Sequence, residues 1–343
     1  MTATTPPTGT PAMVLAGLGA HLPDRVVTND DLASVLDTSD EWITSRTGIR
    51  QRHWAAQGET SMHLAVEAGR KALKATSDSV TDVDAVVLAT MTPDRQCPAT
   101  APDVAAALGL GPIPAFDVGA ICSGFIYAAA TAQGLIAAGT ARRVLIIGTE
   151  VMSHVLHPDD RNTRVIFGDG AGAAVVRAGD PGEQGAFGPF DLGADGSASD
   201  LIRIDASGGR CPPEGPEGNQ RDRFLVMEGR EVYRRAIPAM VESSRAAVRR
   251  RGWDVGDLDA LIGHQANVRI LDAVGDRLEV PADRRYANLD RVGNTSAASV
   301  PIAMTDAHRE GFVHPGDKVL LTAFGGGLTW GSTTLTWPAL PIG

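Results

Sequence analysis

Cys122 is the side chain in this sequence best placed to act as a nucleophile. It follows an apolar, strand-like segment, Ala115-Phe-Asp-Val-Gly119, and it opens an uncharged stretch that begins Ser123-Gly-Phe125. A thiol at a helix N-terminus faces unpaired backbone N–H groups and the positive end of the helix dipole, which favour the thiolate. Gly119 and Gly124 allow a ligand or a second backbone segment to approach closely. On these residues alone, a buried structural cysteine is an equal alternative.

Two further polar residues follow strand-like or turn segments of the C-terminal half. His264 stands in Gly263-His-Gln-Ala-Asn267 and Asn294 in Gly293-Asn-Thr-Ser296. A lone histidine after a strand is usually structural, but an internal repeat places both residues opposite the cysteine turn, so we expect one shared site. The order Cys, His, Asn is also that of papain-like proteases. The chain lacks their Cys-Gly-Ser-Cys-Trp signature and their disulfide-bearing context, which disfavours a cysteine hydrolase.

The internal repeat is visible in three ordered pairs of segments. The two members of a pair differ in numbering by 175 in two cases and by 174 in the third, and the order of the copies is the same in both halves. Short Val/Ile/Leu runs alternating with Ala-rich stretches are typical of an α/β fold whose strands are buried on both faces. We therefore predict two similar α/β halves that face each other. The pairs are 83–88 with 258–263, 118–122 with 292–296, and 143–148 with 318–323.

Length and composition set the class of protein. The 343 residues are 43% hydrophobic and 21% charged, which suits a globular chain of about two domains. The net charge of −10 disfavours nucleic acid as a partner, and three cysteines are too few for a disulfide framework. No basic residue precedes Arg25, so we expect no signal peptide and a cytoplasmic protein. The uncharged stretch 118–140 is long enough for a membrane span, but its Gly, Ala, Ser and Thr content predicts a buried central helix instead.

The chain divides into four predicted segments. Residues 1–11 are expected to be a disordered N-terminal extension, and residues 12–180 form the half that carries the cysteine. Residues 181–223 are rich in Gly and Pro and predict a connecting or covering loop, in which Cys211 is an incidental thiol. Residues 224–343 form the half that carries the histidine and the asparagine.

Several weaker motifs are better explained by ordinary turns and solvated surface than by ligand-binding sites. Leu22 stands where a dinucleotide fingerprint after Gly17-Leu-Gly19 would need glycine, so that fingerprint fails. The segments 167–172 and 324–331 predict tight turns rather than phosphate loops. A solvated turn is favoured over a metal site for His154, His157, Asp159 and Asp160, and no metal is expected. A basic cluster on this acidic chain indicates either a solvated helix face or a surface for an acidic partner: Arg234, Arg235, Arg245 and 249–251.

Taken together, the motifs resemble the β-ketoacyl-ACP synthase III family of the thiolase superfamily, from about Ala12 to the C-terminus. The resemblance implies a thiolase-like fold of two pseudo-symmetric α/β halves in a layered αβαβα arrangement. Elongating ketosynthases use Cys-His-His, so Asn294 points to the priming branch. The matching segments are 40–48, 120–125, 167–172, 263–267, 293–296 and 324–331.

The resemblance implies a decarboxylative Claisen condensation that initiates fatty acid or polyketide-type biosynthesis. Cys122 would take the acyl group from an acyl-CoA, and the backbone N–H groups of Cys122 and Gly326 would hold the oxyanion. Malonyl-ACP would then lose CO2, with His264 and Asn294 donating hydrogen bonds to the enolate oxygen. Acyl-CoA and malonyl-ACP are the substrates, and the chemistry needs no metal or redox cofactor.

The resemblance also implies binding surfaces on a homodimer. A CoA tunnel would be lined by Trp42, Arg46, Arg161 and Asn267, and a basic patch of Arg234, Arg269 and Arg277 would receive the acyl carrier protein. Cys97 and Phe324 would belong to acyl pockets. Many relatives carry a bulky Phe where Cys97 stands, reaching the partner subunit's acyl pocket, so the smaller thiol predicts acceptance of acyl groups larger than acetyl.

Two other functions on the same fold stay open from the sequence. One is transfer of the acyl group from CoA or ACP to a hydroxyl or amine, which the presence of Asn294 disfavours because decarboxylation is the step that needs the paired donors. The other is non-catalytic binding of an acyl carrier, which would be expected to lose Cys122 or His264, and both are present.

Overall fold

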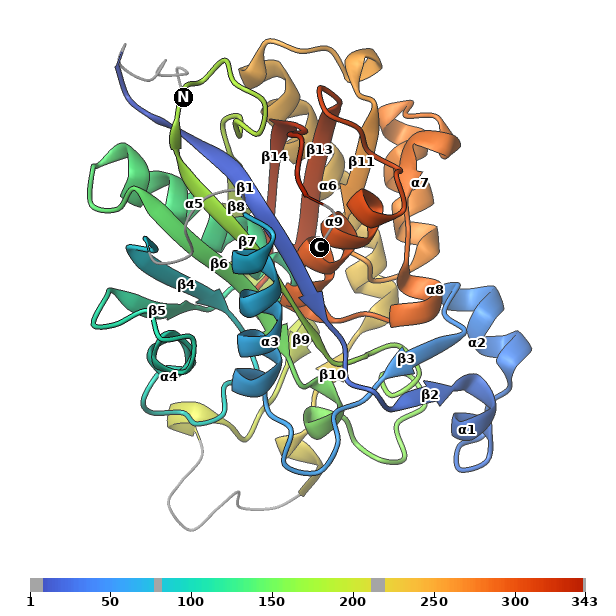
Figure 1. Cartoon of the computed structure of the whole chain (residues 1–343). Coiled ribbons are helices and arrows are strands. Elements are labelled where there is room, and N and C mark those ends of the chain that lie inside the picture. The colour runs from blue at the N-terminus through green and yellow to red at the C-terminus, as the bar shows by residue number, and fades with distance from the viewer. Residues whose placement is uncertain (1–8, 77–81, 211–219, 342–343) are drawn as a thin grey trace.

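Two five-stranded sheets organise the molecule, which is described here from a computed structural model covering residues 9–76, 82–210 and 220–341 (Figure 1). The first sheet has the order β1-β7-β6-β4-β5 and the second β8-β14-β13-β11-β12. The first contains β1 (Ala12–His21), β4 (Ala85–Ala89), β5 (Ala115–Val118), β6 (Arg143–Glu150) and β7 (Gly170–Gly179). The second contains β8 (Asp191–Ala194), β11 (Ala260–Gly263), β12 (Arg285–Tyr286), β13 (Lys318–Gly325) and β14 (Thr329–Thr336).

The two sheets repeat one pattern of pairing. In each sheet, three neighbouring strands are parallel: β5-β4-β6 in the first and β12-β11-β13 in the second. The fourth strand, β7 or β14, pairs antiparallel with the third strand and with the fifth strand, β1 or β8. The first residues of β4 and β11, and those of β6 and β13, are separated by the offset that the sequence repeat predicted. The prediction of two pseudo-symmetric α/β halves is therefore confirmed.

Helices form the other three layers (Figure 1). The central layer is α5 (Gly124–Ala137) with α9 (Ser299–Arg309), and its apolar side chains share one core with residues of both sheets, such as Met13, Val87 and Val319. The outer face of the first sheet is covered by α3 (Ser61–Lys74) and α4 (Thr100–Ala107). The outer face of the second is covered by α6 (Gly229–Arg251) and α7 (Val268–Leu278). The result is the layered αβαβα arrangement expected from the resemblance.

Smaller elements complete the fold around one end of the sheets. The segment between β1 and α3 contains a small hairpin sheet and two helices, and later short elements lie near the functional residues. They are β2 (Val26–Thr28), α1 (Asn29–Ala33), α2 (Asp40–Thr47), β3 (Gln51–His53), β9 (Ile202–Arg203), β10 (Val226–Met227) and α8 (Leu289–Val292).

The uncharged stretch after Cys122 forms α5, as predicted. Alanine is the strongest helix former and loses no side-chain entropy on burial, so an Ala-rich segment can pack tightly between two sheets. Phe125 and Ile126 are almost fully buried in the central core. Among the described residues, no helix has both the length and the apolar character that crossing a bilayer requires.

The segment 181–223 differs in part from its prediction as loop. Its strand β8 pairs antiparallel with β14 and completes the second sheet, so the loop prediction is wrong at Asp191–Ala194. A four-residue strand that contains a glycine, Gly193, is too short to show an alternating pattern in the sequence. The predicted boundaries at 180/181 and 223/224 stay predictions. Residues 1–8 of the predicted N-terminal extension, and Cys211, lie outside the described residues.

Candidate active site

Two equivalent turns carry the functional residues into the space between the halves. A short 3-10 turn, Ile121–Ser123 (η1), precedes α5, and another, Ser296–Ala298 (η8), precedes α9. Ile121 and Ser296 both adopt positive φ, 46° and 49°, which costs a non-glycine residue of order 1–3 kcal/mol. These two residues, and not Cys122 and Ser296, occupy the same place in the two turns. The pairing of Cys122 with Ser296 in the sequence repeat is therefore wrong by one position, and the counterpart of Cys122 is Ala297.

The Cys122 turn lies against the end of β13. A Cβ atom added to Gly325 would lie 2.8 Å from the Cys122 backbone nitrogen, closer than real side chains come. The next residue, Gly326, is equally close to this turn: a Cβ atom added to it would lie 2.8 Å from the Ile121 side chain. A glycine is therefore required at 325, where the added atom would meet backbone, whereas the Ile121 side chain could move away from a Cβ at 326. This puts Gly326, which was predicted to help hold an oxyanion, next to the Cys122 turn.

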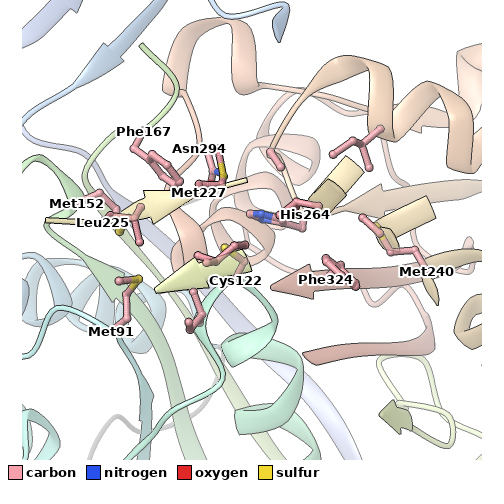
Figure 2. A pocket seen from close by; sticks show the side chains of 16 residues that line it. Met91, Cys122, Met152, Phe167, Leu225, Met227, Met240, His264, Asn294 and Phe324 are labelled. Carbon is pink, nitrogen blue, oxygen red and sulfur yellow. The ribbon is translucent and has the colours of Figure 1, made fainter. Parts of the chain in front are cut away.

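Cys122, His264 and Asn294 line the same small cavity of about 50 Å³ (Figure 2). They come from η1, from the residue after β11, and from the segment just before η8, so three segments distant in sequence converge as predicted. The rest of the lining is apolar and includes four methionines. Its other members are Met91, Ile121, Met152, Phe167, Ile202, Leu225, Met227, Val232, Ala236, Met240, Ala266, Ile270 and Phe324.

Burial dominates the acid–base behaviour of the thiol. Burial is the main reason that the pKa of Cys122 is raised to about 12; the Ser296 hydroxyl acts against this rise, and the nearby Glu150 carboxylate adds to it. The expectation that the helix terminus would favour a thiolate is therefore wrong for the resting protein. The thiol is neutral and needs an acceptor for its proton when it reacts.

His264 is a neutral hydrogen-bond donor. Burial lowers its pKa to about 3, so the ring carries no charge near neutral pH. Its Nδ1 lies 2.5 Å from the Ser299 hydroxyl, which itself accepts a hydrogen bond from the Gln265 backbone N–H at 3.4 Å. The hydroxyl hydrogen is therefore available for Nδ1, and we assign the ring proton to Nε2, on the side of the cavity.

The Asn294 amide is oriented by its neighbours. Its Oδ1 accepts a hydrogen bond from the Ser296 backbone N–H at 2.9 Å, which assigns the amide NH2 to the cavity side. The Asn294 backbone is held by Ile166 and Gly168 at 3.0 and 2.9 Å. His264 and Asn294 thus present two neutral N–H donors beside one thiol. Such a pair can stabilise negative charge on a substrate oxygen without ionising first.

A second cavity of about 220 Å³ connects the surface to this site. It runs from Trp42 and Arg46, on α2, and Asn267, at the start of α7, to Asn294, and it shares Met227 with the first cavity among other residues. The guanidinium groups of Arg46 and Arg161 lie 4.5 and 5.3 Å from the centre of the Trp42 ring. The four predicted CoA contacts are therefore close together at the mouth of the channel.

Asn267 and Arg161 also have bonds within the protein. Asn267 caps α7 through the Arg269 backbone N–H at 2.9 Å and donates to the Arg46 carbonyl at 3.0 Å. Arg161 donates to the Asp37 carbonyl at 2.7 Å. These bonds hold the channel mouth together, because they tie α7 and the segment after β6 to the N-terminal small elements.

Of the two residues predicted for acyl pockets, Phe324 lies at the cavity and Cys97 does not. Phe324 lines the cavity and stacks on Trp330, with ring centres 6.5 Å apart and planes 11° apart. Cys97 is exposed and is not part of this cavity, although Met91 from the same loop is. Its predicted contact with a partner subunit's pocket stays a prediction.

The basic cluster is not one free patch. Arg234, Arg269 and Arg277 are exposed, as a docking surface requires. Arg234 pairs with Glu231 at 3.0 Å and Arg250 with Asp191 at 3.1 Å. Arg251 donates to main-chain carbonyls of the β7–β8 connection. Arg250 and Arg251, which were predicted to belong to a surface cluster, therefore hold the C-terminal end of α6 against the second sheet and the β7–β8 connection.

The sequence analysis missed three polar residues beside the site. Ser296 and Ser299 lie in the segment that follows Asn294, so the repeat could have pointed to them. Glu150 ends a strand whose central residues are apolar, which was its only signal. The candidate metal residues form local turns instead: the His157 ring accepts from the Asp159 backbone N–H at 3.1 Å. In the part of the chain that the structure describes, no three His, Cys, Asp or Glu side chains are grouped as metal ligands would be.

Comparison with known proteins was made for both sequence and structure. Family profiles described as 3-oxoacyl-[acyl-carrier-protein (ACP)] synthase III and as its C-terminal part match residues 116–196 and 248–337. A β-ketoacyl-[acyl-carrier-protein] synthase III of Streptomyces coelicolor is 54% identical over 331 residues, covering 96% of this chain and 99% of that protein. One from Pseudomonas aeruginosa is 48% identical over 329 residues, covering 96% and 98%.

Solved structures agree with the sequence comparison. The crystal structure of 3-oxoacyl-(acyl carrier protein) synthase III from P. aeruginosa superposes with a TM-score of 0.89 at 47% identity, covering 96% of this chain and 99% of that one. The priming β-ketosynthase from the R1128 polyketide biosynthetic pathway superposes with a TM-score of 0.90 at 35% identity, covering 99% of both chains.

Proposed function

The chain belongs to the β-ketoacyl-ACP synthase III family of the thiolase superfamily, whose members are acyltransferases, and from this premise we propose its reaction. It condenses an acyl-CoA starter with malonyl-ACP through an acyl-cysteine and so initiates fatty acid or polyketide-type biosynthesis. One observation carries the proposal: a thiol and two neutral N–H donors open onto one apolar cavity that a channel joins to the surface.

The first step is acylation of Cys122. The sulfur attacks the acyl-CoA carbonyl carbon, the tetrahedral intermediate collapses, and CoA leaves as the thiol with the proton that Cys122 gave up. The backbone N–H groups of Cys122 and Gly326 are the proposed oxyanion donors, each worth about 2.7–4 kcal/mol by analogy with other enzymes. The apolar lining then surrounds the acyl chain.

The second step is decarboxylation and carbon–carbon bond formation. Malonyl-ACP loses CO2, and the electron pair enters an enolate whose oxygen accepts hydrogen bonds from His264 Nε2 and Asn294 Nδ2. The enolate carbon attacks the acyl-cysteine carbonyl, and the Cys122 sulfur leaves as a thiolate that takes up one proton from the solvent. Neutral donors suit this step, because they stabilise the enolate without protonating its carbon.

The partners follow from the surfaces. Trp42, Arg46, Arg161 and Asn267 are the proposed CoA contacts, since an aromatic ring beside two guanidinium groups suits a nucleotide and its phosphates. Exposed Arg234, Arg269 and Arg277 are the proposed contacts for an acidic carrier protein. We propose a homodimer that acts in the cytoplasm with these substrates and no cofactor.

The four methionines of the cavity bear on the starter. Methionine has three rotatable bonds and adapts to irregular shapes, so the cavity enclosing the acyl chain can change its volume. Together with the small side chain at Cys97, this supports acceptance of acyl groups larger than acetyl.

The test is intact-protein mass after incubation with acetyl-, isobutyryl- and hexanoyl-CoA, followed by addition of malonyl-ACP. We expect one acyl adduct and then CO2 release with formation of β-ketoacyl-ACP. An adduct that passes to a hydroxyl or amine without CO2 release would establish acyl transfer instead. An enzyme that turns over acetyl-CoA faster than every larger acyl-CoA would contradict the proposed starter range.

A further inference from the structure

Glu150 is a fully buried carboxylate that the two proposed steps leave without a role. It ends β6 and is 0% exposed. Its oxygens accept hydrogen bonds from the Thr90 and Thr92 hydroxyls, at 3.2 and 2.7 Å, and from the Met91 and Thr92 backbone N–H groups, both at 3.1 Å. The Ser296 hydroxyl lies 3.1 Å from Oε1. Every one of these neighbours donates, so the hydrogen bonds favour the carboxylate over the acid.

The balance between burial and hydrogen bonding places this carboxylate near its midpoint of titration at neutral pH. Burial raises the pKa of Glu150 to about 7, although the hydrogen bonds from Thr92, Met91, Ser296 and Thr90 lower it. Near neutral pH it can therefore both accept and return a proton. Cys122 is the titratable group that faces it, from η1, while the 90–92 turn and η8 present hydroxyls and backbone N–H groups.

Ser296 is the donor to Glu150 that also reaches the nucleophile. Its hydroxyl donates its hydrogen to Glu150 Oε1 at 3.1 Å, and its oxygen also lies within reach of the Cys122 thiol, whose pKa it influences. It begins η8 with a positive φ of 49°. One hydroxyl thus links the thiol to the buried carboxylate, as a chain that passes protons requires.

The other polar side chains at the thiol are donors. His264 carries its proton on Nε2, because Nδ1 is occupied by the Ser299 hydroxyl. Asn294 turns its NH2 to the cavity, because Oδ1 is occupied by the Ser296 backbone N–H. Neither is set up to take the thiol proton, which leaves the Ser296 hydroxyl as its acceptor.

We propose that Ser296 and Glu150 form a proton relay that deprotonates Cys122 as its sulfur attacks the acyl-CoA. The thiol proton moves to the Ser296 oxygen while the hydroxyl proton moves to Glu150 Oε1, and the S–C bond forms at the acyl carbonyl. When the intermediate collapses, the relay runs in reverse and the proton leaves on the CoA thiol. The proposal rests on the acyl-cysteine step of the proposed function.

The experiment measures the rate of acylation against pH without malonyl-ACP, as release of CoA thiol in a single turnover. For the wild type we expect the rate to rise with pH through about 7, as Glu150 ionises. Ser296→Ala should acylate about 10²-fold more slowly, the size of a general-base contribution. Its rise near pH 7 should be replaced by one at alkaline pH, where the thiol ionises by itself.

Three further variants separate the relay from a structural role. Ser296→Thr keeps the hydroxyl and should keep the rise near pH 7. Ser244→Ala removes a buried hydroxyl of α6 that pairs with Ser332 at 3.4 Å, and should leave rate and pH profile unchanged. Glu150→Gln should match Ser296→Ala, but it also weakens the 90–92 turn, so Ser296→Ala decides, since it leaves the backbone bond to Asn294 in place.

The outcomes are distinct. If Ser296→Ala acylates within 3-fold of the wild-type rate with the same pH profile, the relay is wrong while the acyl-cysteine step stands. If the wild type forms no acyl adduct with any acyl-CoA, the proposed function fails first and the relay fails with it.

Discussion

The two halves of this molecule share one backbone and differ in the side chains placed at equivalent positions. Both run a strand into a turn with a residue at positive φ and then into a central helix. When the halves are aligned on these two turns, the first carries the thiol and the buried carboxylate, and the second carries the neutral donors. The equivalent pairs are Ala89 with His264, Gly119 with Asn294, Cys122 with Ala297, Gly124 with Ser299, and Glu150 with Gly325.

The packing of these pairs explains why the chemistry is divided. A Cβ on Gly124 would lie 2.9 Å from the Ala89 Cβ, so the first half closes strand against helix with two small residues. The second half holds His264 and Ser299 at the same two positions, and there the space is filled by a hydrogen-bonded pair. The shared backbone therefore sets where side chains point, and each half is specialised by what fills those positions. The difference predicts that the nucleophile of the first half is needed for acylation, with Ser296 and Gly326 of the second half assisting it, whereas the donors His264 and Asn294 act in decarboxylation.

The largest expected effect is at the thiol. Cys122→Ala should abolish the acyl adduct, because no other described cysteine lines the cavity. Intact mass after incubation with acyl-CoA measures this directly. A persistent adduct of equal mass on the variant would show that the nucleophile lies elsewhere and that the comparison of halves is wrong.

Removing one of the hydrogen-bond donors His264 and Asn294 should slow decarboxylation much more than acylation. In His264→Ala or Asn294→Ala, we expect decarboxylation of malonyl-ACP to fall about 10²- to 10³-fold, the usual cost of one oxyanion donor, while acylation changes little. CO2 release and acyl-adduct formation are measured on the same samples. Equal losses in both steps would mean that His264 and Asn294 do not act specifically in decarboxylation.

The Ser299 hydroxyl should have a smaller effect, through His264. Without it, the Nδ1 tautomer becomes available and part of the enzyme presents an acceptor where a donor is needed. Ser299→Ala should lower the condensation rate about 3- to 10-fold, in line with one hydrogen bond of about 0.5–1.5 kcal/mol. Ser299→Thr, which retains the hydroxyl, should recover most of it. A Thr variant as slow as the Ala variant would point to packing as the cause.

A separate effect, outside catalysis, concerns stability against pH. The folded protein holds His264 neutral to about pH 3, whereas the unfolded chain protonates it from about 6.5, so stability is full above pH 6.5 and falls as the pH is lowered. Glu150 has the opposite effect on stability. Because its pKa is raised, the folded protein binds more protons than the unfolded chain between about pH 4.5 and 7, so the stability that Glu150 contributes is lost as the pH rises through this range.

Urea unfolding of wild type and His264→Ala at pH 6 and pH 4.5 isolates the histidine. We expect the wild type to lose ~2 kcal/mol more than the variant on going to the lower pH, from about 1.36 kcal/mol per unit of pH for one proton. Equal losses would mean that His264 is protonated in the folded state, which would remove the reason to call it a neutral donor.

Much of the fold and part of the site could be predicted from local patterns. Short apolar strands that recur at a nearly constant offset predicted the duplicated α/β halves, and the uncharged Ala-rich stretch predicted the buried α5. The strand β8 was missed because so short a segment between turns carries no periodic signal. Glu150 was missed because an acid at a strand end is ordinarily solvated, and only the packing of η1 and η8 around it makes it buried.

The sequence by itself determined which chemical groups exist and which side of each strand end they occupy, since strand, turn and helix follow from residue type and short-range order. Only the tertiary structure decided how those groups ionise. The local position of Cys122 at a helix start favours a thiolate, yet enclosure by both halves raises its pKa to about 12. Burial is a property of everything packed around a group, and here that packing is supplied by segments from both halves of the chain.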